Sequence, residues 1–214
     1  MAKTLLLGVL LALAAASAPA AATILTIHNL CPYPVWPLIT PDCGSSPISD
    51  NKLMLDGDGR GLVSYDFPHH RPWSGRLTLR THCSPVDPSR WCRTGSSPPA
   101  TVVQLSVHGG RGGRLAAYSV SLAEGFNVPA VVSPHAIGGG QCPALGCTAD
   151  LNDRCPPGKS VWAPGHRVVA CWGPPQYFKH RCPLTRTTAT DVEPLPQHCI
   201  APGELKVVLC QASM

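Results

Sequence analysis

Cysteine and histidine are the residue types whose number and spacing could decide the chemistry of this chain. The sequence contains eleven cysteines and nine histidines. A thiolate beside an imidazole is a zinc-binding pattern, whereas paired thiols form disulfides. His82 precedes Cys83 and His198 precedes Cys199, so both outcomes are open from the spacing alone. The cellular compartment therefore decides between zinc and disulfides.

Residues 1–22 predict a signal peptide. Lys3 provides the basic start, an apolar run extends from Leu5 to Ala16, and small residues before Thr23 suit signal peptidase. An uncleaved anchor is the alternative, but the run is shorter than the ~20 apolar residues of a membrane helix. We expect a secreted mature chain beginning near Thr23. Because that route is oxidising, the cysteines are expected to form disulfides, with no metal and no cofactor.

The composition argues against several classes of protein. Charged residues make up 14% of the chain, against roughly 25% in ordinary globular proteins. The net charge of +5 falls to +4 once Lys3 is removed with the signal peptide. The cations are scattered rather than gathered with aromatic residues, so nucleic acid is not an expected partner. No later stretch of the chain has the length of a membrane span. We also expect the protein to be a monomer.

Short apolar runs between many turns predict a mainly β protein. The 24 prolines and 20 glycines are spread along the chain, which favours many short strands joined by turns. One short helix is expected at 148–152, with Thr148 as its cap. Gly109–Gly113 is a hairpin loop by composition. The predicted strands are 24–27, 62–65, 77–80, 102–107, 115–122 and 205–209.

A change in composition divides the mature chain. Residues up to about Pro134 have strand character and few cysteines, whereas 141–199 contain six of the eleven cysteines. After this cysteine-rich segment, the last predicted strand again has the strand character of the first part of the chain. We therefore expect a β-sandwich core of 23–134 and 200–212, with a disulfide-rich excursion over 135–199.

Six motifs resemble one known family, in the same order along nearly the whole mature chain. They are Thr26-Ile27-His28-Asn29-x-Cys31, Trp73-Ser74-Gly75-Arg76, Gly125-Phe126-Asn127-Val128-Pro129, the cluster Cys142 to Cys155, Cys182-Pro183, and Val207-Val208-Leu209-Cys210. The chain resembles plant thaumatin-like proteins. The resemblance implies an antiparallel β-sandwich with a small disulfide-rich second domain, secretion to the apoplast or cell wall, and antifungal defence. It also implies binding of β-1,3-glucan, with weak endo-β-1,3-glucanase or enzyme-inhibitor activity in some members.

The resemblance also implies a disulfide pairing. The implied pairs are Cys31 with Cys210, Cys83 with Cys92, Cys142 with Cys199, Cys147 with Cys182, and Cys155 with Cys171. Long members have sixteen cysteines, and three of their bridges are missing here. Cys43 has no counterpart in the family pattern. We expect an unpaired surface thiol, and the alternative is a bridge to another chain or a mixed disulfide.

The family's cleft contains one arginine and four acids, which carry over to five positions of this sequence. The arginine falls on Arg76, and the acids fall on Gln104, Ser119, Glu124 and Asp191. Two of the four acids are therefore replaced. Glycoside hydrolysis normally needs two carboxyl groups, so the set fits ligand binding better than acid–base catalysis.

Each of these residues also has a purely structural interpretation. Arg76 could pair with Glu124 on the protein surface, and Glu124 could be an ordinary turn residue before Gly125. Four aromatic residues could stack on a sugar, but in a sandwich they are more often core. They are Tyr33, Trp36, Tyr118 and Phe126.

We expect non-catalytic binding of a cell-wall polysaccharide such as β-1,3-glucan, or of a microbial protein. A weak endo-β-1,3-glucanase is the enzymatic alternative. A third hypothesis is an inhibitor of a foreign hydrolase that acts through an exposed loop at Ser96–Pro99.

Overall fold

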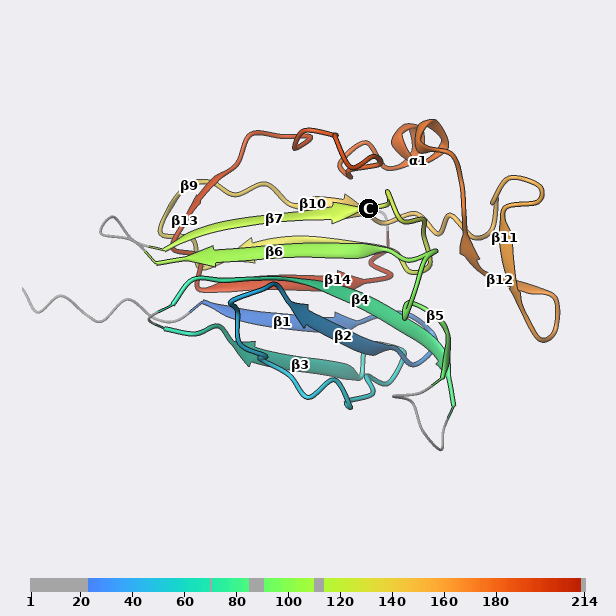
Figure 1. Cartoon of the computed structure of the whole chain (residues 1–214), viewed down its shortest axis with the longest axis horizontal. Helices are drawn as coiled ribbons and strands as arrows, with labels where there is room; N and C mark the ends of the chain where they lie inside the picture. The colour runs from blue at the N-terminus through green and yellow to red at the C-terminus, as the bar shows by residue number, and fades with distance from the viewer. Residues whose placement is uncertain (1–22, 70, 85–90, 110–113, 213–214) are drawn as a thin grey trace, which may run out of the picture.

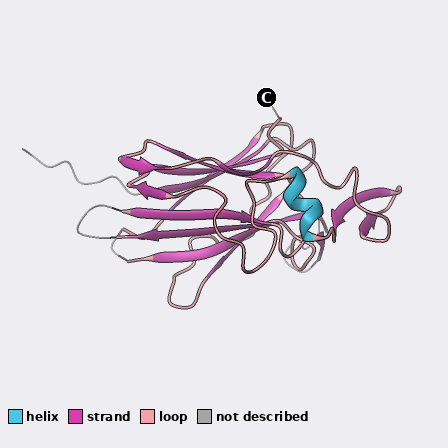
Figure 2. Cartoon of the chain, turned by 90° about the horizontal axis from the view of Figure 1, so that it is seen from above, coloured by secondary structure: helices cyan, strands magenta, loops and turns pink. Residues whose placement is uncertain are grey.

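The structure is a computed structural model that describes residues 23–69, 71–84, 91–109 and 114–212. The predicted signal peptide and residues 110–113 of the predicted Gly-rich loop lie outside the described residues. The chain is mainly β, as expected (Figures 1 and 2). The elements are β1 (Ile24–Asn29), β2 (Trp36–Pro41), β3 (Gly61–Asp66), β4 (Trp73–Cys83), β5 (Cys92–Thr94), β6 (Val102–His108), β7 (Leu115–Ser121), β8 (Ala130–His135), β9 (Gly139–Gln141), β10 (Leu145–Cys147), β11 (Ser160–Ala163), β12 (Arg167–Cys171), α1 (Pro175–Arg181), β13 (His198–Ile200) and β14 (Glu204–Leu209).

Two sheets form a sandwich. One has the strand order β10-β8-β14-β1-β3, and the other has the order β2-β4-β6-β7-β13-β9 with β5 paired to β4. The pairs are antiparallel except that β1 and β14 run parallel. The hairpin β11–β12 forms a separate small sheet at one end of the sandwich, near α1 (Figure 1). Each predicted strand lies on an observed strand, and the thaumatin-like sandwich is confirmed.

Alternation along the strands creates the core. On β6, Val103, Leu105 and Val107 are buried, whereas Gln104 is exposed and Ser106 half-buried between them. Successive side chains of a strand point to opposite faces, so one face of this sheet packs on the second sheet and the other is free to form a polar surface. The same alternation buries alternate residues of β14, which are Leu205, Val207 and Leu209.

The first and last strands are joined both by pairing and by a disulfide. Thr26 of β1 lies opposite Lys206 of β14, and Cys31–Cys210 bridges residues 179 positions apart. In the chain-entropy model a loop of that size constrains the unfolded chain by roughly 5 kcal/mol. The other bridges are Cys83–Cys92, Cys142–Cys199, Cys147–Cys182 and Cys155–Cys171, which are the pairs that the resemblance implies, and Cys43 is free and exposed.

The segment 135–199 does not lie wholly outside the sandwich. Its strands β9 and β13 extend the sheet beyond β7, and β10 extends the other sheet beyond β8. The hairpin β11–β12 and α1 belong to neither sheet. The division at 134/135 and 199/200 stays a prediction.

The helix expected at 148–152 is wrong. That segment is irregular, with the backbone N–H of Asn152 donating to the Asp150 carboxylate at 3.0 Å. Such local side-chain bonds compete with helix formation. Instead α1 begins at Pro175, because proline suits the first helical turn, where its missing N–H has no partner to lose. Among the described residues no helix has the length and apolarity needed to cross a membrane.

Asn127, from the Gly-Phe-Asn-Val-Pro motif, connects three parts of the chain inside the protein. It is 1% exposed. Its side-chain N–H groups donate to the Leu79 carbonyl at 2.6 Å and the Thr94 hydroxyl at 3.0 Å, and its amide oxygen accepts from the Thr101 N–H at 2.9 Å. The preceding Gly125 has φ +97° and lies against Pro99, where a side chain would clash. The motif thus fixes the end of the sandwich to the β4–β5 pair.

Candidate functional site

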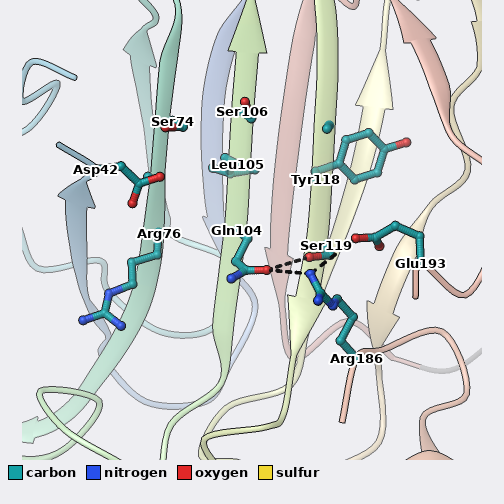
Figure 3. Close-up of a pocket in the computed structure, with 12 residues that line it drawn as sticks. Asp42, Ser74, Arg76, Gln104, Leu105, Ser106, Tyr118, Ser119, Arg186 and Glu193 are labelled. Carbon is teal, nitrogen blue, oxygen red and sulfur yellow. Dashed lines mark hydrogen bonds and ion pairs between the residues drawn. The ribbon is translucent and has the colours of Figure 1, made fainter. Parts of the chain in front are cut away.

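A polar cleft of about 440 Å³ lies on the free face of β4, β6 and β7 (Figure 3). Three of the residues predicted for the site form one row across its floor. Arg76 of β4 lies opposite Gln104 of β6, which in turn lies opposite Ser119 of β7. Directly opposite residues on neighbouring strands share a face of the sheet, so the register alone brings these three side chains together.

The centre of the floor contains an amide and a hydroxyl in place of carboxyl groups. The Ser119 hydroxyl donates to the amide oxygen of Gln104 at 3.2 Å. A second row beside it consists of Ser74 opposite Ser106. Hydroxyl and amide groups can donate to and accept from sugar hydroxyls, but at neutral pH they cannot act as a general acid and base.

Arg76 is ion-paired at the edge of this floor. Its Nη1 lies 3.5 Å from Glu124 Oε1, with the two side chains 51% and 44% exposed. This is the pairing that the sequence offered as the structural alternative. Exposed pairs of this kind contribute ~0–1 kcal/mol, so Arg76 can exchange this contact for one with a ligand at little cost.

Asp191 does not line the cleft. Its carboxylate accepts from the Thr188 hydroxyl at 2.6 Å and from the Thr187 N–H at 2.7 Å, and it lies 3.7 Å from Lys179 Nζ. The Thr188 hydroxyl and the Thr187 N–H hold the pKa of Asp191 well below its usual range, with a smaller contribution from Lys179. These bonds of Asp191 thus stabilise its own loop, which forms one wall of the cleft.

Arg186 is one of the cleft residues that sequence reasoning missed. Its backbone pairs with the end of β7, with Arg186 N–H donating to Val120 O at 2.9 Å and Leu122 N–H donating to Arg186 O at 2.7 Å. This pairing directs its guanidinium over the floor, where Nη1 donates to the Gln104 amide oxygen at 3.3 Å. No motif could have revealed Arg186, because its position depends on a loop returning to β7.

Two acids outside the carried-over set also line the cleft. Glu193 lies 3.6 Å from Arg186 Nη1, and burial raises its pKa while Arg186 opposes that shift. Asp42 follows β2 on the opposite wall, where its N–H donates to Ser74 O at 2.9 Å. Figure 3 shows the two carboxylates on opposite sides of the floor.

The sheet order separates these two acids widely. Asp42 extends β2 and Glu193 lies beyond β7, so that β4, β6 and β7 lie between them. At ~4.8 Å per strand spacing, the walls are roughly 14 Å apart at the backbone. The two carboxylates are therefore held by opposite walls of the cleft, with the Gln104–Ser119 pair between them.

The remaining expectations concern core and loop residues. Trp36, Tyr118 and Phe126 are buried, so the core interpretation holds for them, and Tyr33 is partly buried against the core. In the loop 96–99, Ser96, Ser97 and Pro98 are exposed and Pro99 is buried. Cys83 and Cys199 are in disulfides, and the described residues contain no group of three potential metal ligands.

A disulfide-linked β-sandwich with a polar cleft across one sheet is the class of protein that this geometry defines. Residues 29–174 match the Thaumatin family. The chain therefore belongs to the thaumatin family, and membership makes it a defence-related, pathogenesis-related type of protein.

Three relatives indicate the range of this similarity. An osmotin-like protein of Solanum lycopersicum is 33% identical over 228 residues, which cover 87% of this chain and 88% of that protein. A thaumatin-like protein of Arabidopsis thaliana is 33% identical over 166 residues, covering 71% of this chain and 65% of that protein. A glucan endo-1,3-beta-glucosidase of Prunus avium is 34% identical over 180 residues, covering 73% of this chain and 69% of that protein.

Proposed function

We propose that this protein is a secreted, antifungal-type defence protein that binds β-1,3-glucan, or another cell-wall polysaccharide, in the cleft over β4, β6 and β7 without hydrolysing it. The observation that carries the proposal is the hydrogen-bonded pair of Gln104 and Ser119 at the centre of the floor. The exposed amide and guanidinium groups of this row suit an uncharged sugar chain, because each can bond a hydroxyl without needing a charged partner. The Ser119 hydroxyl, at 3% exposure, orients the Gln104 amide from below.

Arg76 and Arg186 supply the strongest hydrogen-bond donors of the proposed site. Both line the cleft, one at each end of the Gln104–Ser119 pair. Their present carboxylate partners, Glu124 and Glu193, lie 3.5 and 3.6 Å away. A bound sugar hydroxyl would accept from either guanidinium while the carboxylates accept from neighbouring hydroxyls. The ligand thereby replaces water without leaving a charge unpaired.

The test is co-sedimentation of the refolded mature protein, residues 23–214, with insoluble β-1,3-glucan, together with a reducing-sugar assay of the supernatant. We expect binding without release of reducing sugar. Arg186→Gln removes a charged donor worth ~1.5 kcal/mol and should weaken binding about tenfold. Arg154→Gln is the matched control, because Arg154 is an exposed arginine outside the cleft. Absence of glucan binding by the wild-type protein would overturn the proposal.

A weak endo-β-1,3-glucanase is the second candidate function. The observation that favours it is Glu193, whose pKa is raised by burial as a general acid requires. Sugar release by the wild-type protein that Glu193→Gln abolishes would establish this alternative. Inhibition of a xylanase, amylase or protease without glucan binding would instead favour an inhibitor acting through the exposed residues 96–98.

A further inference from the structure

Two exposed tryptophans meet at one arginine, far from the cleft. Trp91 is 59% exposed and lies just before β5, and Trp162 is 53% exposed on β11. Arg93 connects them, since its Nη1 donates to the Trp162 carbonyl at 2.8 Å and its guanidinium lies 5.8 Å from the centre of a Trp91 ring. We call Trp91, Arg93 and Trp162 the tryptophan–arginine patch. Large exposed apolar side chains that gather on a surface mark binding sites more often than chance exposure does.

Arg93 is exposed and has a permanent positive charge. Among the described residues no carboxylate lies within ion-pair distance of its guanidinium. Arg167 lies near His82 as well, but Asp150 and Asp153 line the same pocket as His82 and Arg167, so the positive charge of the patch itself comes from Arg93. A ligand for this surface therefore gains most if it has a negative charge.

The patch and the cleft are separate sites. Ser84 N–H donates to the Trp91 carbonyl at 2.8 Å, and Cys92 lies opposite Cys83 at the last residue of β4. Arg76 of the cleft precedes Cys83 by seven residues on the same strand. At ~3.3 Å per residue the patch lies roughly 23 Å from Arg76, at the end of the sandwich near β5 and β11 (Figure 1).

We propose that the tryptophan–arginine patch binds an acidic glycan, a polysaccharide whose sugars have carboxylate groups. The face of an indole ring is negative and attracts the polarised C–H groups on the face of a sugar ring. A guanidinium donates two parallel hydrogen bonds to a carboxylate. Trp91, whose ring lies beside the Arg93 guanidinium, and Trp162, whose carbonyl accepts from it, provide both contacts for neighbouring sugars of one chain. The inference is independent of the function proposed for the cleft.

The surroundings favour a glycan over a membrane. Surfaces that insert into lipid combine indoles with aliphatic side chains on one apolar face. Here the turn that follows β11 consists of Pro164, Gly165 and His166, and β12 then begins at Arg167. Trp162 lies on a strand, and the Trp91 carbonyl accepts from Ser84 N–H, so the backbone under both tryptophans is fixed by hydrogen bonds.

The test measures binding of the refolded mature protein to polygalacturonate and to its fully methyl-esterified form, which has no charge. We expect at least tenfold tighter binding to the acid form, weakening as salt is raised. Arg93→Gln should remove most of this preference, whereas Trp162→Ala should weaken binding to both forms. Trp172→Ala is the matched control, because Trp172 is 48% exposed but no contact joins it to Arg93. Arg186→Gln in the cleft should leave this binding unchanged.

Several outcomes would overturn the proposal. Wild-type protein that does not bind polygalacturonate is one, and equal binding by the wild-type and Arg93→Gln proteins is another. Binding to phosphatidylserine vesicles that requires Trp91 and Trp162, without polygalacturonate binding, would show that the surface recognises lipid instead. Equal melting temperatures of all variants ensure that a loss of binding is not a loss of folding. Loss of glucan binding in the Arg186→Gln protein with polygalacturonate binding intact would confirm that the two sites are separate.

Discussion

Arg186 Nη1 lies 3.3 Å from the amide oxygen of Gln104, although the two residues are 82 positions apart in the chain. A guanidinium thus stands over the position where the thaumatin-like resemblance expects a carboxylate. With glutamate at position 104 the same guanidinium would form an ion pair. With glutamine it donates to a neutral oxygen and remains available to a ligand.

The first prediction is that restoring the two replaced acids creates hydrolysis. Gln104→Glu combined with Ser119→Asp places two carboxyl groups on adjacent strands, where Gln104 and Ser119 are directly opposite each other. General acid–base catalysis contributes typically 10²–10⁴-fold, so we expect measurable reducing-sugar release from a linear β-1,3-glucan by the double variant only. Gln104→Glu with Ser119→Asn is the control. Clear turnover by the wild-type protein that Glu124→Gln abolishes would contradict the non-catalytic proposal.

The second prediction concerns the long disulfide. Replacing Cys31 and Cys210 together by alanine removes the bridge that joins the two ends of the chain. Loss of a native disulfide from a secreted domain typically costs about 2–5 kcal/mol. Cys43→Ser should leave the stability nearly unchanged, because the Cys43 thiol is free and exposed. The measurement is the melting temperature under oxidising conditions. Equal melting temperatures for the Cys31/Cys210 double variant and Cys43→Ser would contradict the prediction.

The third prediction is that Asn127→Ala destabilises the fold without touching the cleft. The change removes the Asn127 side chain from the buried Leu79 carbonyl and the Thr101 N–H, whereas the Thr94 hydroxyl keeps its bond to the Thr81 hydroxyl. An unsatisfied buried group costs about 1–3 kcal/mol, so the urea midpoint should fall markedly. Gln176→Ala, an exposed amide, is the control. A midpoint equal to that of the control would show that the contacts of Asn127 are not needed.

The fourth prediction is a pH-dependent contribution from Asp191. Its pKa is lowered in the folded protein, chiefly by the Thr188 hydroxyl and the Thr187 N–H. A lowered folded pKa stabilises the protein above the unfolded value of about 3.9, and this stabilisation is lost as the pH falls through the folded pKa. Asp191→Asn should therefore reduce stability at pH 6, and the difference from wild type should shrink below about pH 4. Urea unfolding at several pH values measures the stability difference between wild type and Asp191→Asn. A stability difference that is constant with pH would contradict the lowered pKa of Asp191.

The local pattern of the sequence determined the strands and the class of fold. Alternation such as that of Val103, Gln104 and Leu105 marks a half-buried strand wherever it occurs, because strand geometry alternates side chains between two faces. The motif order pointed to the family, and the family pattern implied the disulfide pairs that spacing alone left open. The helix was missed because proline can begin a helix as well as end one, and only the surrounding structure distinguishes the two.

Which residues share the cleft was decided only by the tertiary structure. The sequence placed Arg76, Gln104 and Ser119 at candidate positions, but strand register put them in one row. Arg186 and Glu193 entered the site, and Asp191 stayed outside it, because a loop pairs with β7 through backbone groups that every residue has. Backbone pairing of this kind requires no particular side chain, so the sequence does not indicate it. The meeting of Trp91 and Trp162 at Arg93 has the same origin, since it depends on how the hairpin β11–β12 lies against β5.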